Sequence, residues 1–372
     1  MTERRVEIVG AGFAGLTAAC ALAQRGWRVR VHERAERLRT AGAGINVYEN
    51  GLRVLEAVGA AEETLRDAFV TRLRETRDEH DRLLATHRWD IRVFGVVRQR
   101  MNDALAAAAR RAGAEIVVNS EGLSAAPSGE LLLSSGEKIR ADLIVAADGV
   151  NSRIRDSLAL VRKRRFLRDG CIRAMFPQNI GNDGRTIEYW SGKRRLLYNP
   201  ASTSMLYLAL SMPHDDEDAR ILPLNKDLWR QSFPRLGSLI DRIGEGRYDR
   251  FEYLRLKRWS AGKVAVIGDA AHAIPPNIGQ GAGCAMMNAL ALAVYLEQAP
   301  EASGGLREWE RRERPLTEHT QRISLLYGMP AFWPKRLRAA FYWLAGRSRW
   351  LTEQRTRTAR HVPTGTTEAF TS

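Results

Sequence analysis

The sequence predicts an α/β protein with a mostly parallel sheet, because apolar runs of strand length repeatedly lead into glycine turns. Residues 6–9 precede a glycine-rich turn, and residues 141–147 precede an Asp-Gly turn. Residues 264–267 precede Gly268 and Asp269. Runs without polar alternation are typical of strands that are covered on both faces. Ligands of an open α/β sheet bind at the carboxyl ends of its strands, which is where Asp269 is expected.

The first of these strands leads into the strongest local motif. Gly10, Gly12 and Gly15 form the pattern Gly-x-Gly-x-x-Gly before a helical segment, and a second strand over 29–32 ends at Glu33. In a dinucleotide-binding unit the three glycines permit a tight turn, close approach of a pyrophosphate and helix packing, in that order. The acidic residue then binds the hydroxyls of an adenosine ribose. The context favours a Rossmann-like dinucleotide site over a merely glycine-rich turn.

The turn after the third strand is stiff and leads into a helix. Pro275 and Pro276 restrict the backbone, and residues 279–283 lead into an apolar helix over 285–296. The first N–H groups of a helix lack intrahelical partners and can stabilise negative charge. His272, in the same turn, is expected to order the turn instead of acting as a catalytic base.

In this order the motifs resemble those of the group A flavin-dependent aromatic monooxygenases, the para-hydroxybenzoate hydroxylase family. The family's second mark, an Asp-Gly segment ending in Ser-x-x-Arg, corresponds to the segment from Asp148 through Ser152 to Arg155, and its third mark to Gly268-Asp269. The resemblance implies a Rossmann-like FAD-binding domain of the glutathione-reductase type. It also implies NADH or NADPH and O2 as co-substrates, with oxygen transferred from a flavin C4a-hydroperoxide.

The resemblance assigns contacts with FAD residue by residue. Asp269 should bind the ribityl chain, Arg98 should approach the ribityl and pyrophosphate groups, and Asp148 should touch both FAD and the nicotinamide cofactor. From the residues alone, Asp269 could be only a helix cap, Arg98 only a solvated charge and Asp148 only a turn-ordering residue. The complete set of predicted FAD-binding residues is Gly10, Gly12, Phe13, Ala14, Gly15, Glu33, Arg34, Gly44, Ile45, Arg98, Asp148, Asp269, Gly281, Ala282 and Gly283.

The predicted catalytic residues are Arg195, Tyr207 and Pro276. Within the family, the chain resembles the pyridine-carboxylate oxygenases in particular. Arg195 and Tyr207 correspond by position to an arginine and a tyrosine that bind substrate in those enzymes. A guanidinium offers a fork to a carboxylate, and a phenol can donate to or accept from a ring hydroxyl or nitrogen. The alternatives are a surface cation and a half-buried strand tyrosine. Three further positions that align with tyrosines there differ here and argue against assuming the same substrate: Asn46, Arg74 and Phe251.

The resemblance therefore implies a monooxygenase that acts on a small hydroxylated or aminated aromatic or N-heteroaromatic carboxylic acid. A ring-opening pyridine-carboxylate oxygenase of the same family is one alternative. A flavin oxidase or dehydrogenase without oxygen insertion is another, and it would share the FAD motifs.

The FAD-binding domain is predicted to be discontinuous, over residues 1–70, 95–165 and 256–310. Residues 71–94 and 166–255 alternate in the manner of strands and should build an antiparallel sheet that binds substrate over the flavin. Residues 311–372 should form a C-terminal helical segment and a loosely ordered tail.

Composition is consistent with an enzyme. The 372 residues are 44% hydrophobic and can bury a sizeable core. The net charge of +15 is dispersed without a nucleic-acid module, so we expect no nucleic-acid partner and an attraction for anionic ligands. The basic, amphipathic segment 333–343 is expected to be a packing helix or a homodimer contact, although such a segment could also lie on a membrane.

The remaining sequence features concern location and metals. No stretch of about 18 apolar residues and no signal-peptide core occurs, so no integral membrane segment and a cytoplasmic location are expected. Cys20, Cys171 and Cys284 lie far apart without metal-ligand spacing, and Cys20 and Cys284 fall in apolar helical patterns. We expect buried thiols there and neither a disulfide nor a metal.

Overall fold

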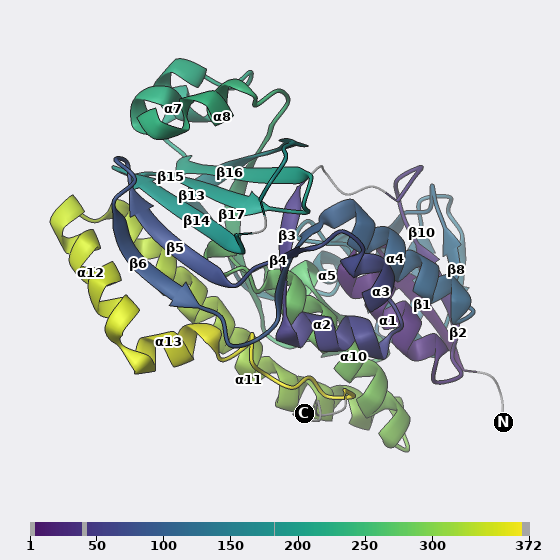
Figure 1. The fold of residues 1–372 in the computed structure, drawn as a ribbon. Coiled ribbons are helices and arrows are strands. Elements are labelled where there is room, and N and C mark those ends of the chain that lie inside the picture. Colours follow the sequence, from purple (N-terminus) through teal and green to yellow (C-terminus); the bar gives the residue numbers. More distant parts are fainter. Residues whose placement is uncertain (1–3, 39–42, 182, 367–372) are drawn as a thin grey trace.

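A six-stranded sheet forms the first layer of the molecule (Figure 1). The structure is a computed structural model, and it describes residues 4–38, 43–181 and 183–366. The strand order is β18-β19-β12-β1-β2-β8, and every pair is parallel except β18 with β19. The strands are β1 (Arg5–Val9), β2 (Arg28–His32), β8 (Glu115–Val117), β12 (Leu143–Ala146), β18 (Ser260–Ala261) and β19 (Val264–Val266). Since β1, β12 and β19 are neighbours, the three turns identified in the sequence meet at one edge.

Apolar helices and a small meander share the core of this layer. Ten of the eleven residues of α1 are buried, and α10 is apolar along most of its length. The meander contributes Leu131 and Leu133 to the same core. The helices are α1 (Phe13–Ala23), α2 (Glu49–Ala57), α3 (Ala61–Leu65), α4 (Arg98–Arg111), α5 (Arg153–Ser157), α9 (Asp269–His272), η2 (Pro276–Ile278) and α10 (Gly281–Gln298). The meander consists of β9 (Gly122–Ala126), β10 (Glu130–Leu133) and β11 (Lys138–Arg140).

A seven-stranded sheet forms a second layer, with the order β17-β13-β16-β15-β14-β5-β6. One face buries Leu208 and Leu210 against Trp229 and Phe233 of the small helices drawn above it in Figure 1. The strands are β5 (Leu73–Asp78), β6 (Leu83–Arg88), β13 (Val161–Pro177), β14 (Arg185–Ser191), β15 (Arg194–Pro200), β16 (Met205–Pro213) and β17 (Arg247–Leu256). The helices on that face are α6 (Glu217–Arg220), α7 (Lys226–Ser232), η1 (Pro234–Leu236) and α8 (Gly237–Asp241).

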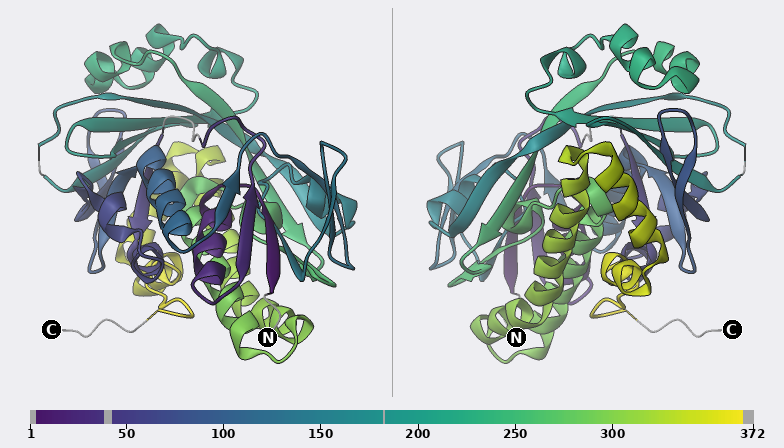
Figure 2. Two further views of the ribbon diagram at one scale, coloured as in Figure 1. Left: turned by 90° about the vertical axis from the view of Figure 1, so that its right-hand side faces the viewer. Right: turned by 90° about the vertical axis from the view of Figure 1, so that its left-hand side faces the viewer.

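A short antiparallel sheet of β3 (Gly44–Tyr48), β7 (Val93–Val97) and β4 (Phe69–Val70) brings the two layers together. A Cβ on Gly44 would lie 2.7 Å from the Cβ of Tyr207 on β16, so glycine permits this approach. The C-terminal helices then run along the other side of the molecule (Figure 2). They are α11 (Ala302–Gly328), η3 (Met329–Phe332), α12 (Lys335–Arg347) and α13 (Arg349–Thr356).

The predicted fold class is confirmed, and the details differ in three respects. The seven-stranded sheet is mixed, because β5 pairs in parallel with β14. The boundaries expected after residues 94, 165, 255 and 310 fall inside continuous elements, namely β7, β13, β17 and α11. The described part of the tail is packed instead of loose: Ala359 is 1% exposed and its carbonyl accepts the N–H of Asn50 at 3.1 Å.

Two further features concern the membrane and the thiols. No helix within the described ranges is long and apolar enough to cross a bilayer. The thiols of Cys20 and Cys284 are buried as expected, and Cys171 is buried as well; all three are free.

Candidate active site

The glycine motif forms the turn between β1 and α1. Gly10 has a φ of +102°, and a Cβ there would lie 2.4 Å from the carbonyl oxygen of Ala147. A Cβ on Gly15 would lie 1.9 Å from the carbonyl oxygen of Gly10, so this glycine lets α1 pack against the turn. A Cβ on Gly12 would meet no protein atom within 4 Å, and Gly12 is exposed. The turn therefore combines tight packing at two glycines with open space at the one expected to face a pyrophosphate.

Glu33 lies beside this turn, just after β2. Its Oε2 accepts the N–H of Ala11 at 2.9 Å and its Oε1 accepts the N–H of Ala35 at 3.0 Å. Arg34 is exposed next to it. The carboxylate predicted to bind a ribose thus lies against the loop that would bind the pyrophosphate.

Asp148 orders the turn that follows β12. Its Oδ2 accepts the N–H groups of Arg153 at 2.9 Å and of Ile154 at 3.4 Å, which supports the turn-ordering interpretation. Its Oδ1 is buried without a hydrogen-bond partner among the described residues. Burial raises the pKa of this carboxyl. The hydrogen bonds of Oδ2 show that Asp148 orders the turn, and its contact with FAD stays a prediction.

Asp269 and Arg98 lie close enough to influence each other's charge. Asp269 begins α9, is reached by solvent, and makes no hydrogen bond within the described ranges. The surrounding protein raises the pKa of Asp269, and Arg98 and Arg173 oppose that shift. Arg98 begins α4, where burial lowers its pKa, and its guanidinium lies 4.8 Å from the ring centre of Phe13. Arg98 is therefore not a solvated surface charge, and the Asp269 carboxylate has free oxygen atoms for a ligand.

The other predicted FAD-binding residues surround the same region. Ala14 is buried on α1 beside Gly268, and Ile45 follows Gly44 at the start of β3. Gly281, Ala282 and Gly283 are partly exposed at the start of α10, which has no side-chain cap. Uncapped N–H groups of a helix start favour a negative ligand. An open glycine turn, available carboxylate oxygens and an uncapped helix start together fit a flavin dinucleotide.

Tyr207 projects from β16 into a small apolar cluster with Ala43, Ala201 and Phe251. Burial raises the pKa of Tyr207, and the nearby Arg173 on the neighbouring strand β13 opposes that shift. A buried phenol with a raised pKa stays protonated near neutral pH. It can therefore donate or accept a hydrogen bond there.

Arg195 lies on the same sheet face but its guanidinium is already engaged. Nη2 donates to Oδ2 of Asp169 at 3.1 Å, and Nη1 donates to Oδ1 of Asn277 at 3.0 Å. A second carboxylate, that of Glu188, lies 3.8 Å from Nη1. The side chain is 6% exposed, which excludes the alternative of a surface cation. Two acids oppose its charge, so Arg195 offers less to a substrate carboxylate than the sequence suggested.

Pro276 is exposed at the start of η2, and the next residue, Asn277, links this turn to Arg195. Sequence reasoning missed Asn277, although it directly follows the predicted proline. It also missed Asp169 and Arg173, whose roles depend on the pairing of β13. The positions noted as departures are dispersed: Phe251 packs beside Tyr207, while Arg74 forms an ion pair at 2.9 Å with Glu188.

His272 has a structural environment. Its Nε2 accepts from the amide of Asn288 at 2.9 Å, and burial lowers its pKa to about 4. The imidazole therefore stays neutral at physiological pH. These contacts support a turn-ordering residue.

Comparisons with known proteins agree with this geometry. A family model described as "FAD binding domain" matches residues 3–227 and 239–319. A putative 2-heptyl-3-hydroxy-4(1H)-quinolone synthase of Rhodococcus erythropolis is 42% identical over 373 residues, covering 98% of each chain. A 2-heptyl-3-hydroxy-4(1H)-quinolone synthase of Mycobacteroides abscessus is 41% identical over 363 residues, covering 94% of this chain and 96% of the relative.

A solved structure is similar over nearly the whole chain. The tetrameric form of 2-methyl-3-hydroxypyridine-5-carboxylic acid oxygenase matches with a TM-score of 0.88 and 37% identity, covering 99% of both chains. This pyridine-carboxylate oxygenase is of the kind that the sequence motifs resemble, so the predicted family is confirmed. The chain belongs to the FAD binding domain family and is one of its FAD-dependent aromatic monooxygenases.

Proposed function

We propose that this enzyme uses NADH or NADPH and O2 to hydroxylate a neutral N-heteroaromatic ring, with 4(1H)-quinolones as the first substrate class. The proposal rests chiefly on one observation: the guanidinium of Arg195, the expected carboxylate anchor, is satisfied by Asp169 and Asn277. A ring without a carboxylate does not need that anchor. Relatives that are 41–42% identical over at least 93% of this chain bear the name of a quinolone synthase, which supports the same class.

The surroundings of Tyr207 support a neutral, largely apolar substrate. Three partly buried apolar side chains, Met175, Leu197 and Met205, pack against the cluster that contains Tyr207. Such a surface can contact an aromatic ring or an alkyl chain, and the phenol can address a ring carbonyl or N–H. We propose that Tyr207 orients the ring in this way.

We propose that the FAD-binding residues named above act together at the edge of the first layer. Bound FAD supplies the activation of oxygen. The glycine turn and Glu33 hold the adenosine and pyrophosphate portion, Asp269 and Arg98 bind near the ribityl chain, and the start of α10 favours negative charge at the other end. The seven-stranded sheet and the turn at Pro276 restrict water above the reacting ring, and the C-terminal helices close the substrate side.

A small aromatic or N-heteroaromatic carboxylic acid is the second candidate substrate. The solved relative, whose name contains a pyridine carboxylic acid, supports it at 37% identity. We favour hydroxylation over ring opening for either substrate, because the quinolone relatives are named for a hydroxylated product. We propose that the protein forms a homodimer. The solved relative is described as tetrameric.

Oxidation of NADH and of NADPH by the FAD-loaded enzyme should be measured with each substrate class. The test compound is 2-heptyl-4(1H)-quinolone, which lacks only the 3-hydroxyl group of the product in the relatives' name. Hydroxynicotinates and aminated or hydroxylated benzoates form the comparison set. We expect the quinolone to accelerate oxidation and to gain one oxygen atom from ¹⁸O2. Acceleration by the acids alone would reverse the order of the two candidates. Oxidation without oxygen incorporation into any compound would indicate an oxidase or dehydrogenase and refute the proposal.

A further inference from the structure

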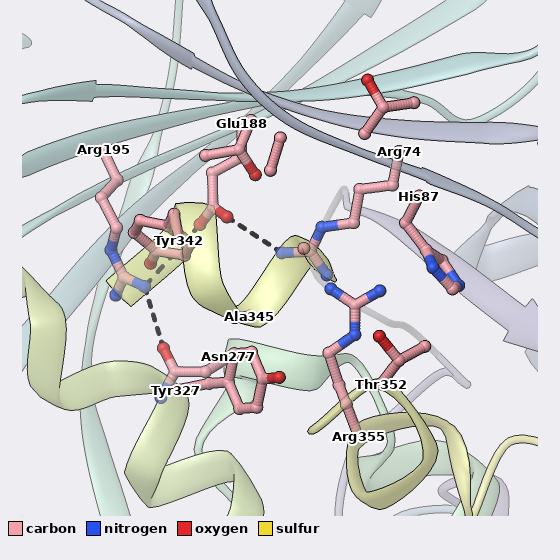
Figure 3. Close-up of a pocket in the computed structure, with 14 residues that line it drawn as sticks. Arg74, His87, Glu188, Arg195, Asn277, Tyr327, Tyr342, Ala345, Thr352 and Arg355 are labelled. Atoms are coloured by element: carbon pink, nitrogen blue, oxygen red, sulfur yellow. Dashed lines mark hydrogen bonds and ion pairs between the residues drawn. The ribbon is translucent and has the colours of Figure 1, made fainter. Parts of the chain in front are cut away.

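A polar cavity lies between the seven-stranded sheet and the C-terminal helices. Its volume is about 40 Å³, and it is lined by residues of β5, β6, β14 and β15, with α12 and α13 on the opposite side (Figure 3). Since one water needs roughly 10–15 Å³ of such space, the cavity holds a few waters or one small polyatomic ion and not a bicyclic ring. Of the residues predicted for FAD or catalysis, only Arg195 lines it. The cavity therefore lies apart from the residues assigned to FAD, and it borders the proposed substrate site through Arg195 and Asn277.

Three guanidinium groups line this cavity, and they differ in how their charge is balanced. Arg74 pairs with Glu188 at 2.9 Å, and Arg195 pairs with Asp169 at 3.1 Å. Arg355, on α13, forms no ion pair with any residue in the described ranges, and its Nε is buried without a hydrogen-bond partner. Burial, and then repulsion from Arg74, lower the pKa of Arg355 to about 10, so it remains a cation at neutral pH. The guanidinium of Arg355 also lies 5.8 Å and 5.9 Å from the ring centres of Trp89 and Tyr327, so its partners among the described residues are aromatic rings and not carboxylates.

A second unsatisfied polar group faces the first. The guanidinium of Arg355 lies between Arg74 and the ring of His87 in Figure 3, and Nε2 of His87 is buried without a hydrogen-bond partner in the described part of the chain. Burial, with a smaller contribution from Arg355, lowers the pKa of His87 to about 4, so this ring is neutral. A neutral imidazole has one N–H, and Nε2 is a donor in the tautomer that carries the hydrogen there. Buried donors without acceptors are costly, so in that tautomer an acceptor between Arg355 and His87 would satisfy both groups.

We propose that this cavity binds a small oxyanion, with Arg355 as its principal ligand and Arg74 and His87 as additional donors. An oxyanion is the acceptor that a planar guanidinium fork matches best. It would balance the charge of Arg355 and join α13 to β5 and β6. The oxyanion can be free, such as inorganic phosphate or sulfate, or it can be the carboxylate of an aromatic acid. The proposal does not depend on which ring the enzyme oxidises.

The test measures the binding of inorganic phosphate to the FAD-loaded enzyme by calorimetry, and the melting temperature at constant ionic strength. Wild-type enzyme should bind phosphate saturably and melt at a higher temperature as phosphate is added. Arg355→Met should weaken binding at least tenfold. Without phosphate it should melt no lower than the wild type, because the substitution breaks no ion pair among the described residues and keeps an apolar stem beside Trp89 and Tyr327. The matched control is Arg357→Met, which removes the same charge from an exposed position two residues away and should leave phosphate binding unchanged.

Two further arms keep the result interpretable. Arg355→Lys keeps the charge without the fork, so it should bind phosphate with intermediate affinity even if the methionine variant folds poorly. Competition between phosphate and an aromatic carboxylate would identify a carboxylate as an alternative occupant of the same site, whereas simultaneous binding would identify a free oxyanion. Equal phosphate affinity in wild type and Arg355→Met, or stabilisation that chloride reproduces at the same ionic strength, would overturn the proposal.

Discussion

Replacement of Arg195 by methionine should lower the free energy of unfolding, and this loss must be measured before any change in substrate binding is interpreted. Methionine keeps an apolar stem of similar length but removes two hydrogen bonds, to Asp169 and Asn277, and leaves the buried Asp169 carboxylate without its cation. Removal of one partner from a buried ion pair costs about 3–5 kcal/mol. Arg185→Met is the control, because Arg185 and its partner Asp183 are 39% and 44% exposed. That change should cost about 1 kcal/mol or less.

The assay is urea unfolding of both variants at pH 7, with FAD content measured in each. Asp169→Asn should be combined with Arg195→Met, because neutralising the stranded carboxylate should recover part of the loss. A coupling of about 1–3 kcal/mol is expected for two residues in direct contact. If Arg195→Met loses no more stability than the control, or the double variant shows no coupling, the Arg195–Asp169 ion pair does not contribute the expected stability. Arg195 would then again be a candidate carboxylate anchor.

Three other predictions concern FAD binding and the residue Tyr207 on the seven-stranded sheet. Gly12→Ala should change the free energy of unfolding without FAD by no more than about 0.5 kcal/mol, since the added Cβ would meet no described atom within 4 Å, but it should weaken FAD binding because it fills space expected for the pyrophosphate. Gly15→Ala should lower the free energy of unfolding, since its Cβ would lie 1.9 Å from the carbonyl oxygen of Gly10. Equal stability of the two variants would contradict this contrast. Asp269→Asn should raise the dissociation constant of FAD roughly 10- to 150-fold through loss of a charged hydrogen bond, measured by flavin fluorescence, and unchanged affinity would remove Asp269 from the site. Tyr207→Phe should divert NAD(P)H oxidation toward hydrogen peroxide with little loss of FAD. Because burial raises the pKa of Tyr207, this effect should not vary from about pH 6 to 9, and a variation there would argue for an ionised phenol.

The cofactor half of the site could be predicted from sequence because its determinants are local. The turn around Gly10, Gly12 and Gly15 depends on residues within one βαβ unit, and the structure places each glycine as the motif requires. Asp269 likewise follows its strand directly. Parallel neighbours in the sheet then bring these turns to one edge, as the fold class implies.

The substrate half could not be predicted, because its charges meet across strands that are distant in sequence. Arg195 on β15 and Asp169 on β13 are separated in the sheet by β16, so the pairing follows from strand order and not from spacing. The parallel pairing of β5 with β14 similarly brings Arg74 to Glu188. The packed tail around Ala359 depends on contacts with α2 that no local pattern indicates.

Because these arginines pair with carboxylates across the sheet, the basic composition of the chain does not by itself predict an acidic substrate. An arginine count suggests an acidic substrate, yet a ligand responds only to charge that the protein has not already balanced. On the substrate face, Arg195 is opposed by two carboxylates, and Tyr207 lies in an apolar cluster. Arg355, a cation without an ion pair among the described residues, lies instead in a cavity too small for an aromatic bicycle. A neutral ring above the flavin and an oxyanion beside α13 are therefore compatible in one enzyme, and the phosphate and quinolone experiments test them separately.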